Sequence, residues 1–244
     1  MRTIGRAPWA DLVMHVLAHA GATVRLAPSL VDARYVAWAA AALPEARPLA
    51  EDARAIGALA TTHDALVTAQ MVAWLFRTKE RARAVGERAL AELRADDVDA
   101  PEVLDAAQGE AAELVWCAAL LEDEAHGRLP PIAIDDARVA AAIDAITPIA
   151  PELARCEVSV LPALRLRGRV FGPHVWVGAP CAELDVDVDH VAWQAAHEAT
   201  VREVSLRSAL PFDALERAAL DLLAARARDA GRAAEHAAWR ARFA

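Results

Sequence analysis

Histidine and carboxylate side chains recur in residues 190–207, at spacings that a single helix would bring to one side. His190, His197 and Glu198 are the strongest candidates, with Glu198 expected on the polar side of the helix and the histidines at its edge. Imidazole and carboxylate groups suit iron or zinc, whereas magnesium prefers oxygen ligands and retained waters. We therefore predict His190, His197 and Glu198 as candidate metal ligands.

The spacing within this segment also argues against a compact metal site. His190 and His197 lie two helical turns apart, about 10 Å along the axis, so a second element would have to supply a ligand between them. Glu110 or Glu113, from a packed helix, could provide that carboxylate. A zincin is excluded, because Val201 stands where the HExxH pattern needs its second histidine. The alternative is that both histidines are hydrogen-bonded residues at the boundary of the core.

A second group of candidate ligands lies near the beginning of the chain. Asp11, His15 and His19 follow one another at intervals of four residues, which would let two imidazoles chelate one ion, with the aspartate as a third ligand. Nothing else that is polar and tightly spaced is near them in sequence. The pattern therefore favours a solvated helix face over a metal site.

A third group crowds the end of the helix predicted over residues 102–127. Glu122, Glu124 and His126 lie in its last turn. Helical bundles build di-iron centres from such residues, but the paired Glu-x-x-His motifs of those centres are absent. We expect this group, too, to be the wet face of a long helix.

An arginine row precedes the histidine segment. Arg165, Arg167 and Arg169 alternate with apolar residues, which predicts a half-buried strand. The turn Gly172-Pro173 and a second alternating segment that contains Trp176 complete a hairpin. A peptide could add to this hairpin as a further strand, with the arginines selecting an acidic partner. The predicted binding residues are Arg165, Arg167, Arg169 and Trp176.

Helical periodicity covers most of the remaining chain. The predicted helices span residues 8–20, 32–43, 48–60, 61–94, 102–127, 135–146, 190–207, 211–229 and 232–243. The fold class is therefore mainly α with minor β: a multi-helix, bundle-like protein with one short antiparallel hairpin near residues 156–178. Prolines and the onset of alternation between residues 147 and 156 suggest a helical domain over 1–150 and a hairpin-plus-helices subdomain over 151–244, unless the two form one continuous domain.

Composition limits the classes of partner. The 244 residues are 56% hydrophobic, with a net charge of −9 and a pI near 5.4, which argues against nucleic acid as a partner. The alanine- and arginine-rich composition, with a single lysine, is typical of a GC-rich bacterial genome. Three cysteines without a CxxC motif fit a reducing compartment. No signal sequence or apolar run long enough to cross a membrane is visible, so we expect a soluble cytoplasmic protein.

Two functions remain. No G-x-S-x-G, P-loop or G-x-G-x-x-G motif is present. The order of hairpin and then three helices loosely resembles small winged-helix peptide-recognition modules of peptide-modifying systems, and this resemblance implies peptide binding. We predict an accessory or scaffold protein that binds a protein or peptide, or a second copy of itself, through the C-terminal hairpin and helix region. The alternative is a metal-dependent His/carboxylate enzyme using iron or zinc, an oxidoreductase.

Overall fold

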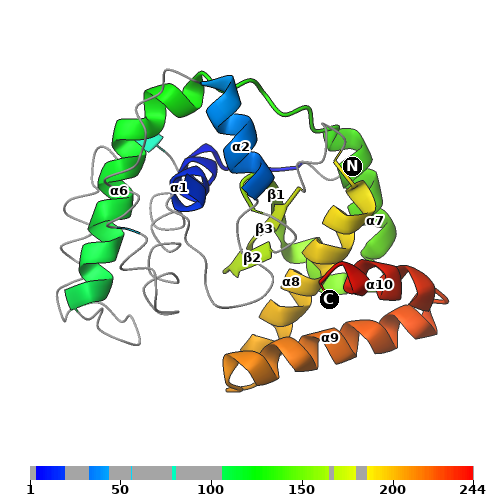
Figure 1. The fold of residues 1–244 in the computed structure, drawn as a ribbon. Helices are drawn as coiled ribbons and strands as arrows, with labels where there is room; N and C mark the ends of the chain where they lie inside the picture. Colours follow the sequence, from blue (N-terminus) through cyan, green and yellow to red (C-terminus); the bar gives the residue numbers. More distant parts are fainter. Residues whose placement is uncertain are drawn as a thin grey trace. The chain divides into compact units, whose positions relative to one another are not determined.

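The computed structural model describes residues 4–19, 33–43, 56, 79–80, 106–164, 168–179 and 186–243 (Figure 1). The chain forms two compact units. Unit 1 comprises Met1–Arg6 and Ile132–Ala244, and unit 2 comprises Ala7–Pro131. The described elements are mostly helices accompanied by one small sheet, so the predicted mainly α fold class with minor β is confirmed.

Unit 2 contains three long described helices. They are α1 (Pro8–His19), α2 (Ala33–Ala42) and α6 (Ala106–Gly127). Helix α1 packs against both α6 and α2. Pro8 is the first residue of α1, at the start predicted from the sequence. Backbone nitrogens in the first helical turn have no intrahelical acceptor, so a proline there costs no hydrogen bond. The predicted helices over 48–60 and 61–94 lie outside the described residues, apart from Ile56 and residues 79–80.

Helix α1 is buried around most of its circumference. Every residue from Trp9 to Ala18 except Asp11 is buried. Because neighbouring elements cover several sides of it, such a helix has no broad solvent-exposed face. The prediction that Asp11, His15 and His19 share a solvated face is therefore wrong for His15, which is 2% exposed.

Two helices of unit 1 begin at an aspartate cap. The carboxylate of Asp135 accepts hydrogen bonds from the backbone N–H groups of Ala137 and Arg138, at 3.1 and 3.0 Å. Asp187 accepts from the N–H of His190 at 3.0 Å. Both satisfy donors that a helix start leaves without an intrahelical partner. The elements of unit 1 are α7 (Asp136–Ile146), η1 (Pro151–Arg155), β1 (Glu157–Leu161), β2 (Gly168–Phe171), β3 (His174–Gly178), α8 (Val188–Arg207), α9 (Phe212–Asp229), α10 (Ala233–Arg240) and η2 (Ala241–Phe243).

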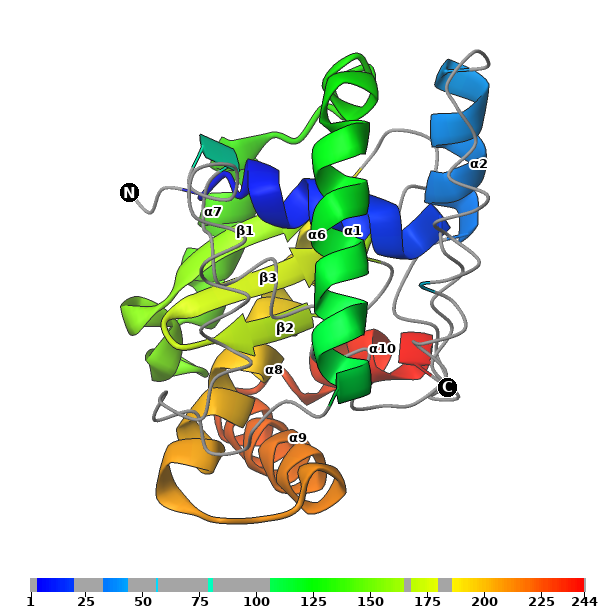
Figure 2. The same ribbon diagram turned by 90° about the vertical axis from the view of Figure 1, so that its left-hand side faces the viewer.

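The predicted hairpin is present as β2 and β3, which pair antiparallel. Gly172 starts the two-residue connection with a φ of 55°, a conformation that residues with a side chain rarely adopt. A third strand, β1, pairs parallel with β3 and gives the order β1-β3-β2, visible in Figure 2. Gly5 extends this sheet beyond β1, where its N–H donates to the carbonyl of Val158 at 2.7 Å.

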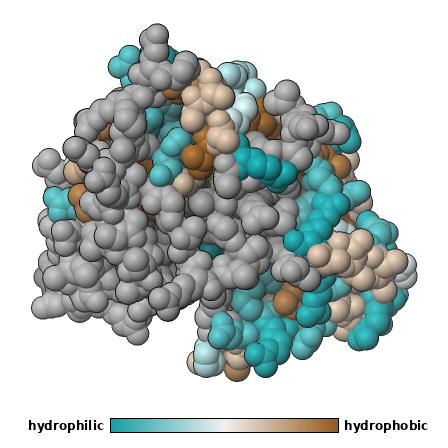
Figure 3. All heavy atoms as spheres, viewed as in Figure 1, coloured by the Kyte–Doolittle hydropathy of each residue, from teal (hydrophilic) through white to brown (hydrophobic). Residues whose placement is uncertain are grey.

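Helix α8 is the central element of unit 1. It packs against α7, α9, η1, β2 and β3, so residues His190 to Val201 are all buried. The core around it combines valines of β1 and β3 with Ile143 of α7 and Trp193 of α8. Hydrophilic side chains gather along the outer helix α9 (Figure 3). The division of the chain falls after Pro131, and the boundary proposed near residues 147–156 stays a prediction.

No helix in the described part of the chain is both long enough and apolar enough to cross a membrane.

Candidate functional site

The three predicted metal ligands lie deep inside unit 1. His190, His197 and Glu198 are 1%, 5% and 6% exposed. Glu198 is therefore not on a polar face, and the histidines are not at the edge of the core. The sequence pattern missed this because α8 has packing partners on all sides, and a helical wheel assumes that one side faces water.

Glu198 is held by polar neighbours within the core. Gln194 donates a hydrogen bond from Nε2 to its Oε1 at 2.7 Å, and His197 Nδ1 lies 3.5 Å from the same oxygen. Burial raises the pKa of Glu198, but His197, Arg169 and Gln194 outweigh burial and hold this pKa below its usual value. A carboxylate fixed in this way stabilises the contact between α8 and β2.

His197 also contacts α9 and α10 of the same unit. Its Nε2 lies 3.4 Å from Glu216 Oε2 of α9, and its ring is 5.7 Å from that of Trp239 in α10. His236 of α10 packs on Trp239 and on Trp193. These contacts join α8, α9 and α10, which is a structural role.

The predicted binding surface is only partly in view. Arg165 and Arg167 lie outside the described residues. Arg169 lies in β2 opposite Trp176 of β3 and donates a hydrogen bond to the carbonyl of Gly168 at 2.8 Å. Trp176 is 4% exposed, which argues against its predicted role as an exposed contact.

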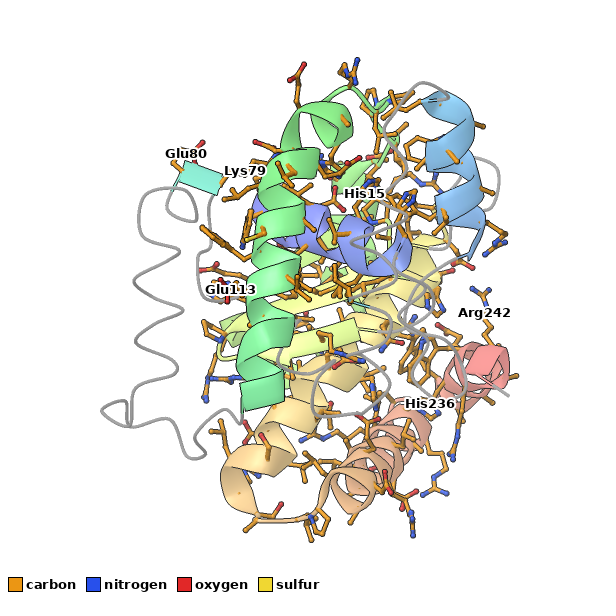
Figure 4. The ribbon with its side chains drawn as sticks, turned by 60° about the vertical axis from the view of Figure 1, so that its left-hand side comes forward. His15, Lys79, Glu80, Glu113, His236 and Arg242 are labelled. Carbon is orange, nitrogen blue, oxygen red and sulfur yellow. The ribbon has the colours of Figure 1, made fainter. Side chains whose placement is uncertain are left out.

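Unit 2 contains a polar cluster that the sequence presented only as two separate groups. Helix α1 supplies Asp11, His15 and His19, and helix α6 supplies Glu122 and His126. We call these five residues the α1–α6 cluster. The ring of His15 lies 4.4 Å from that of His19 and 4.9 Å from that of His126, centroid to centroid. Figure 4 shows His15 on α1 beside α6, with Glu113 on another part of α6.

Two imidazole–carboxylate pairs connect the helices of this cluster. His15 Nε2 lies 3.6 Å from Glu122 Oε1, and His126 Nε2 lies 3.5 Å from Asp11 Oδ2. Glu122 is 8% exposed. Charges buried this deeply must be compensated by partners or by a cation, since an isolated buried carboxylate is costly.

The electrostatics keep one imidazole neutral. Burial and the neighbouring His15 lower the pKa of His19 to about 4, while Glu122 opposes this change. At neutral pH His19 is therefore uncharged and one ring nitrogen carries a lone pair. Its Nε2 is buried and has no hydrogen-bond partner among the described residues.

The sequence signal for this cluster was present in each helix but not across them. Spacing of four residues appears in Asp11-x3-His15-x3-His19 and again in Glu122-x3-His126. Each group alone resembles an ordinary solvated face. Glu124 is exposed and lies outside the cluster. Glu113 also lies outside it; this residue was one of the two carboxylates predicted to complete a site with His190 and His197. The side chain of Glu110, the other one, lies outside the described residues.

Across the described part of the chain, no three His, Cys, Asp or Glu side chains are already arranged to hold a metal ion. This applies to His190, His197 and Glu198 as well as to the α1–α6 cluster. Comparison with protein-family models, with curated proteins and with solved structures finds no match to this chain. Any function must therefore be inferred from these contacts.

Proposed function

We propose that the protein is a metal-dependent enzyme whose iron or zinc ion is bound by the α1–α6 cluster. The observation that supports this proposal most is the convergence of three imidazoles and two carboxylates from two helices in one largely buried region. Helical bundles build metal centres in this way, from inward-facing side chains on different helices.

The distances within the two imidazole–carboxylate pairs support this proposal. At 3.5 and 3.6 Å they exceed the ~2.7–3.2 Å of an N–H to oxygen hydrogen bond. Two ligands bound at ~2.1 Å to one tetrahedral ion would lie about 3.4 Å apart. Each pair taken alone is therefore spaced as two ligands of one ion could be, although no three of these side chains are arranged to hold it.

Binding would require the side chains to rotate, since no three of them are arranged to hold an ion. The terminal torsions of His, Asp and Glu have broad energy wells, so a change in ring or carboxylate orientation is cheap. The neutral state of His19 supports this proposal further, because only a neutral imidazole ligates a metal.

The identity of the ion decides the class of reaction. Iron would support the oxidoreductase chemistry that the sequence offered as the alternative function, whereas zinc has no redox chemistry and would support hydrolysis through an activated water. Three imidazoles with carboxylates suit either ion. Reconstituting the purified full chain with Fe(II) under anaerobic conditions, and separately with Zn(II), followed by elemental analysis, tests the proposal. One bound equivalent is expected, and no bound metal under either condition would overturn it.

A second candidate function is protein or peptide binding at the outer edge of β2. Within the described sheet, β2 pairs with β3 alone, so its other edge is a site where an extended acidic segment or a second copy of this chain could add as a strand near Arg169. Hydrogen exchange tests this proposal. A partner that co-purifies with the protein should slow exchange of the β2 amides, and a partner that leaves them unchanged would contradict it.

A further inference from the structure

The outer edge of β1 is occupied by three residues from far away in the sequence. Ile4, Gly5 and Arg6 belong to unit 1, and we call them the edge segment. Gly5 forms an isolated parallel bridge with Ser159 of β1, and its N–H donates to the carbonyl of Val158 at 2.7 Å. Since β3 pairs with the other side of β1, the edge segment lies where a further strand of the sheet would lie.

Ile4 and Gly5 determine which side chains fit this edge. The side chain of Ile4 is 5% exposed and belongs to the hydrophobic core of unit 1, together with Val158. Gly5 lies so close to β1 that a Cβ on it would come within 2.8 Å of Ser159 Oγ and 3.3 Å of the Val158 carbonyl oxygen. Ser159 is itself buried, so its hydroxyl has little room to turn away from a larger side chain. The edge therefore fits a large aliphatic residue followed by glycine.

Arg6 adds a charged contact at the start of α7. Its Nη2 donates to Oδ2 of Asp136 at 2.7 Å, and Asp136 lies in the first turn of the helix, where a carboxylate is favoured. The two side chains are 61% and 42% exposed, so solvent and salt weaken their attraction. The ion pair therefore contributes to the choice of residue more than to the strength of attachment.

The edge segment is attached to β1 over a much shorter length than β3 is. In the described part of the chain it pairs with β1 at Gly5, whereas β1 and β3 pair over five residues. Segments with few buried contacts open at a lower free energy than the rest of the fold. When the edge segment opens, β1 presents backbone groups to which another extended segment can bond.

We propose that the outer edge of β1 binds an extended segment of a partner protein with the pattern large aliphatic residue–Gly–Arg, and that the edge segment fills this site until the partner displaces it. The partner repeats the fit of Ile4, Gly5 and Arg6. It can add hydrogen bonds along β1, because Val160 points its backbone groups to the same side as Val158. This proposal is independent of metal binding and concerns the edge of the sheet opposite to β2.

A synthetic peptide with the sequence of residues 2–8 tests the site in the unmodified full chain. Only the protein is labelled with nitrogen-15, so that NMR follows its own Gly5 amide. Excess peptide should displace the edge segment and speed hydrogen exchange of the Gly5 N–H, which loses its bond to Val158. A peptide with valine in place of the glycine should not bind. Absence of binding by the first peptide, or binding that leaves Gly5 protected and slows exchange of the β2 amides, would overturn the proposal.

The variant Gly5→Val provides an independent measurement. Its branched side chain does not fit against Ser159, so the site should be open and the peptide should bind about tenfold more tightly or better, because the competing closed state is lost. The matched control is Gly127→Val, since a Cβ on Gly127 meets no atom within 4 Å. This control should bind the peptide as the unmodified chain does. Equal peptide affinity in a folded Gly5→Val variant and the unmodified chain would overturn the proposal, and if the variant does not fold, the exchange measurement decides.

The oligomeric state distinguishes a partner protein from a second copy of this chain, which carries the same pattern. Analytical ultracentrifugation should show that the unmodified chain and Gly5→Val have the same mass in solution. A dimer of the unmodified chain that Gly5→Val dissociates would overturn the assignment to a partner protein and give the site to a second copy.

Discussion

The Nε2 atom of His15 lies 3.6 Å from the Oε1 atom of Glu122 in the interior of unit 2, although the two residues belong to the first and last helices described there. Neither helix reveals this pair in its own sequence. The contact converts two patterns that each resemble a wet helix face into one largely buried group of titratable side chains. Such groups are concentrated at functional sites.

We expect the double variant His15→Ala, His126→Ala to lose the bound iron or zinc, because it removes one imidazole from each helix of the cluster. The matched control is the double variant His190→Ala, His197→Ala, which removes the two histidines that the sequence favoured. Elemental analysis after reconstitution measures both. Metal retained by the first variant and lost by the second would place the site in unit 1 instead.

Gly168→Ala should destabilise the protein by about 1–3 kcal/mol, the usual cost of overpacking a core. A Cβ at this position would come within 2.8 Å of the carboxyl carbon of Glu198, whose carboxylate is held by Gln194. Urea unfolding measures the change. Gly127→Ala is the control, since a Cβ there meets no atom within 4 Å, and it should not destabilise. Equal changes in the free energy of unfolding for the two substitutions would show that the Glu198 side chain moves aside at little cost.

Asp187→Ala should cost about 1 kcal/mol of folding free energy, because the carboxylate caps α8 by accepting from the N–H of His190 and also contacts Arg242. Asp189→Ala removes an exposed carboxylate from the same first turn and should cost less. A larger loss from Asp189→Ala than from Asp187→Ala would contradict the assignment of the cap.

The cap should also depend on pH. Burial raises the pKa of Asp187, but the His190 N–H and Arg242 outweigh burial and hold this pKa below its usual 3.8. A carboxyl group whose pKa is lower in the folded state stabilises the fold at pH values above its unfolded-state pKa. This stability is lost as the pH falls through its folded-state pKa. The difference between Asp187→Ala and the unmodified chain should therefore shrink below pH 3.8. A difference that stays constant in acid would contradict this account.

His236 should make unit 1 sensitive to mild acid. Burial, Arg240 and His197 lower its pKa from 6.5, so the folded state favours the neutral ring. The stability that the neutral His236 ring contributes is complete above pH 6.5 and is lost progressively as the pH falls below that value. We expect the free energy of unfolding to fall between pH 7 and pH 5, and His236→Gln to reduce this fall.

Urea unfolding of the full chain at the two pH values measures this effect. The control is His174→Gln, which removes a partly exposed histidine of β3 from the same unit. Figure 4 shows His236 and Arg242 on the same C-terminal segment. An unchanged pH dependence in His236→Gln would mean that another group causes the acid sensitivity.

Local features of the fold were predictable from the sequence. Asp135 and Asp187 cap helices that begin close to the predicted starts at residues 135 and 190, and Gly172 lies in the expected turn between two strands. Each depends on contacts a few residues apart, which a single sequence displays. Strand β1 was not predicted, because its parallel pairing with β3 depends on a partner that is not its neighbour in the chain.

The sequence by itself determined the mainly helical class, most ends of the described helices and the types of residue available for chemistry. Only the tertiary structure decided which of those residues meet. It buried Glu198 inside unit 1, where a helical wheel placed it in water, and it joined Asp11, His15 and His19 to Glu122 and His126 in unit 2. The physical reason is that helical spacing records which side chains share a face, whereas burial and pairing depend on the element that covers the face.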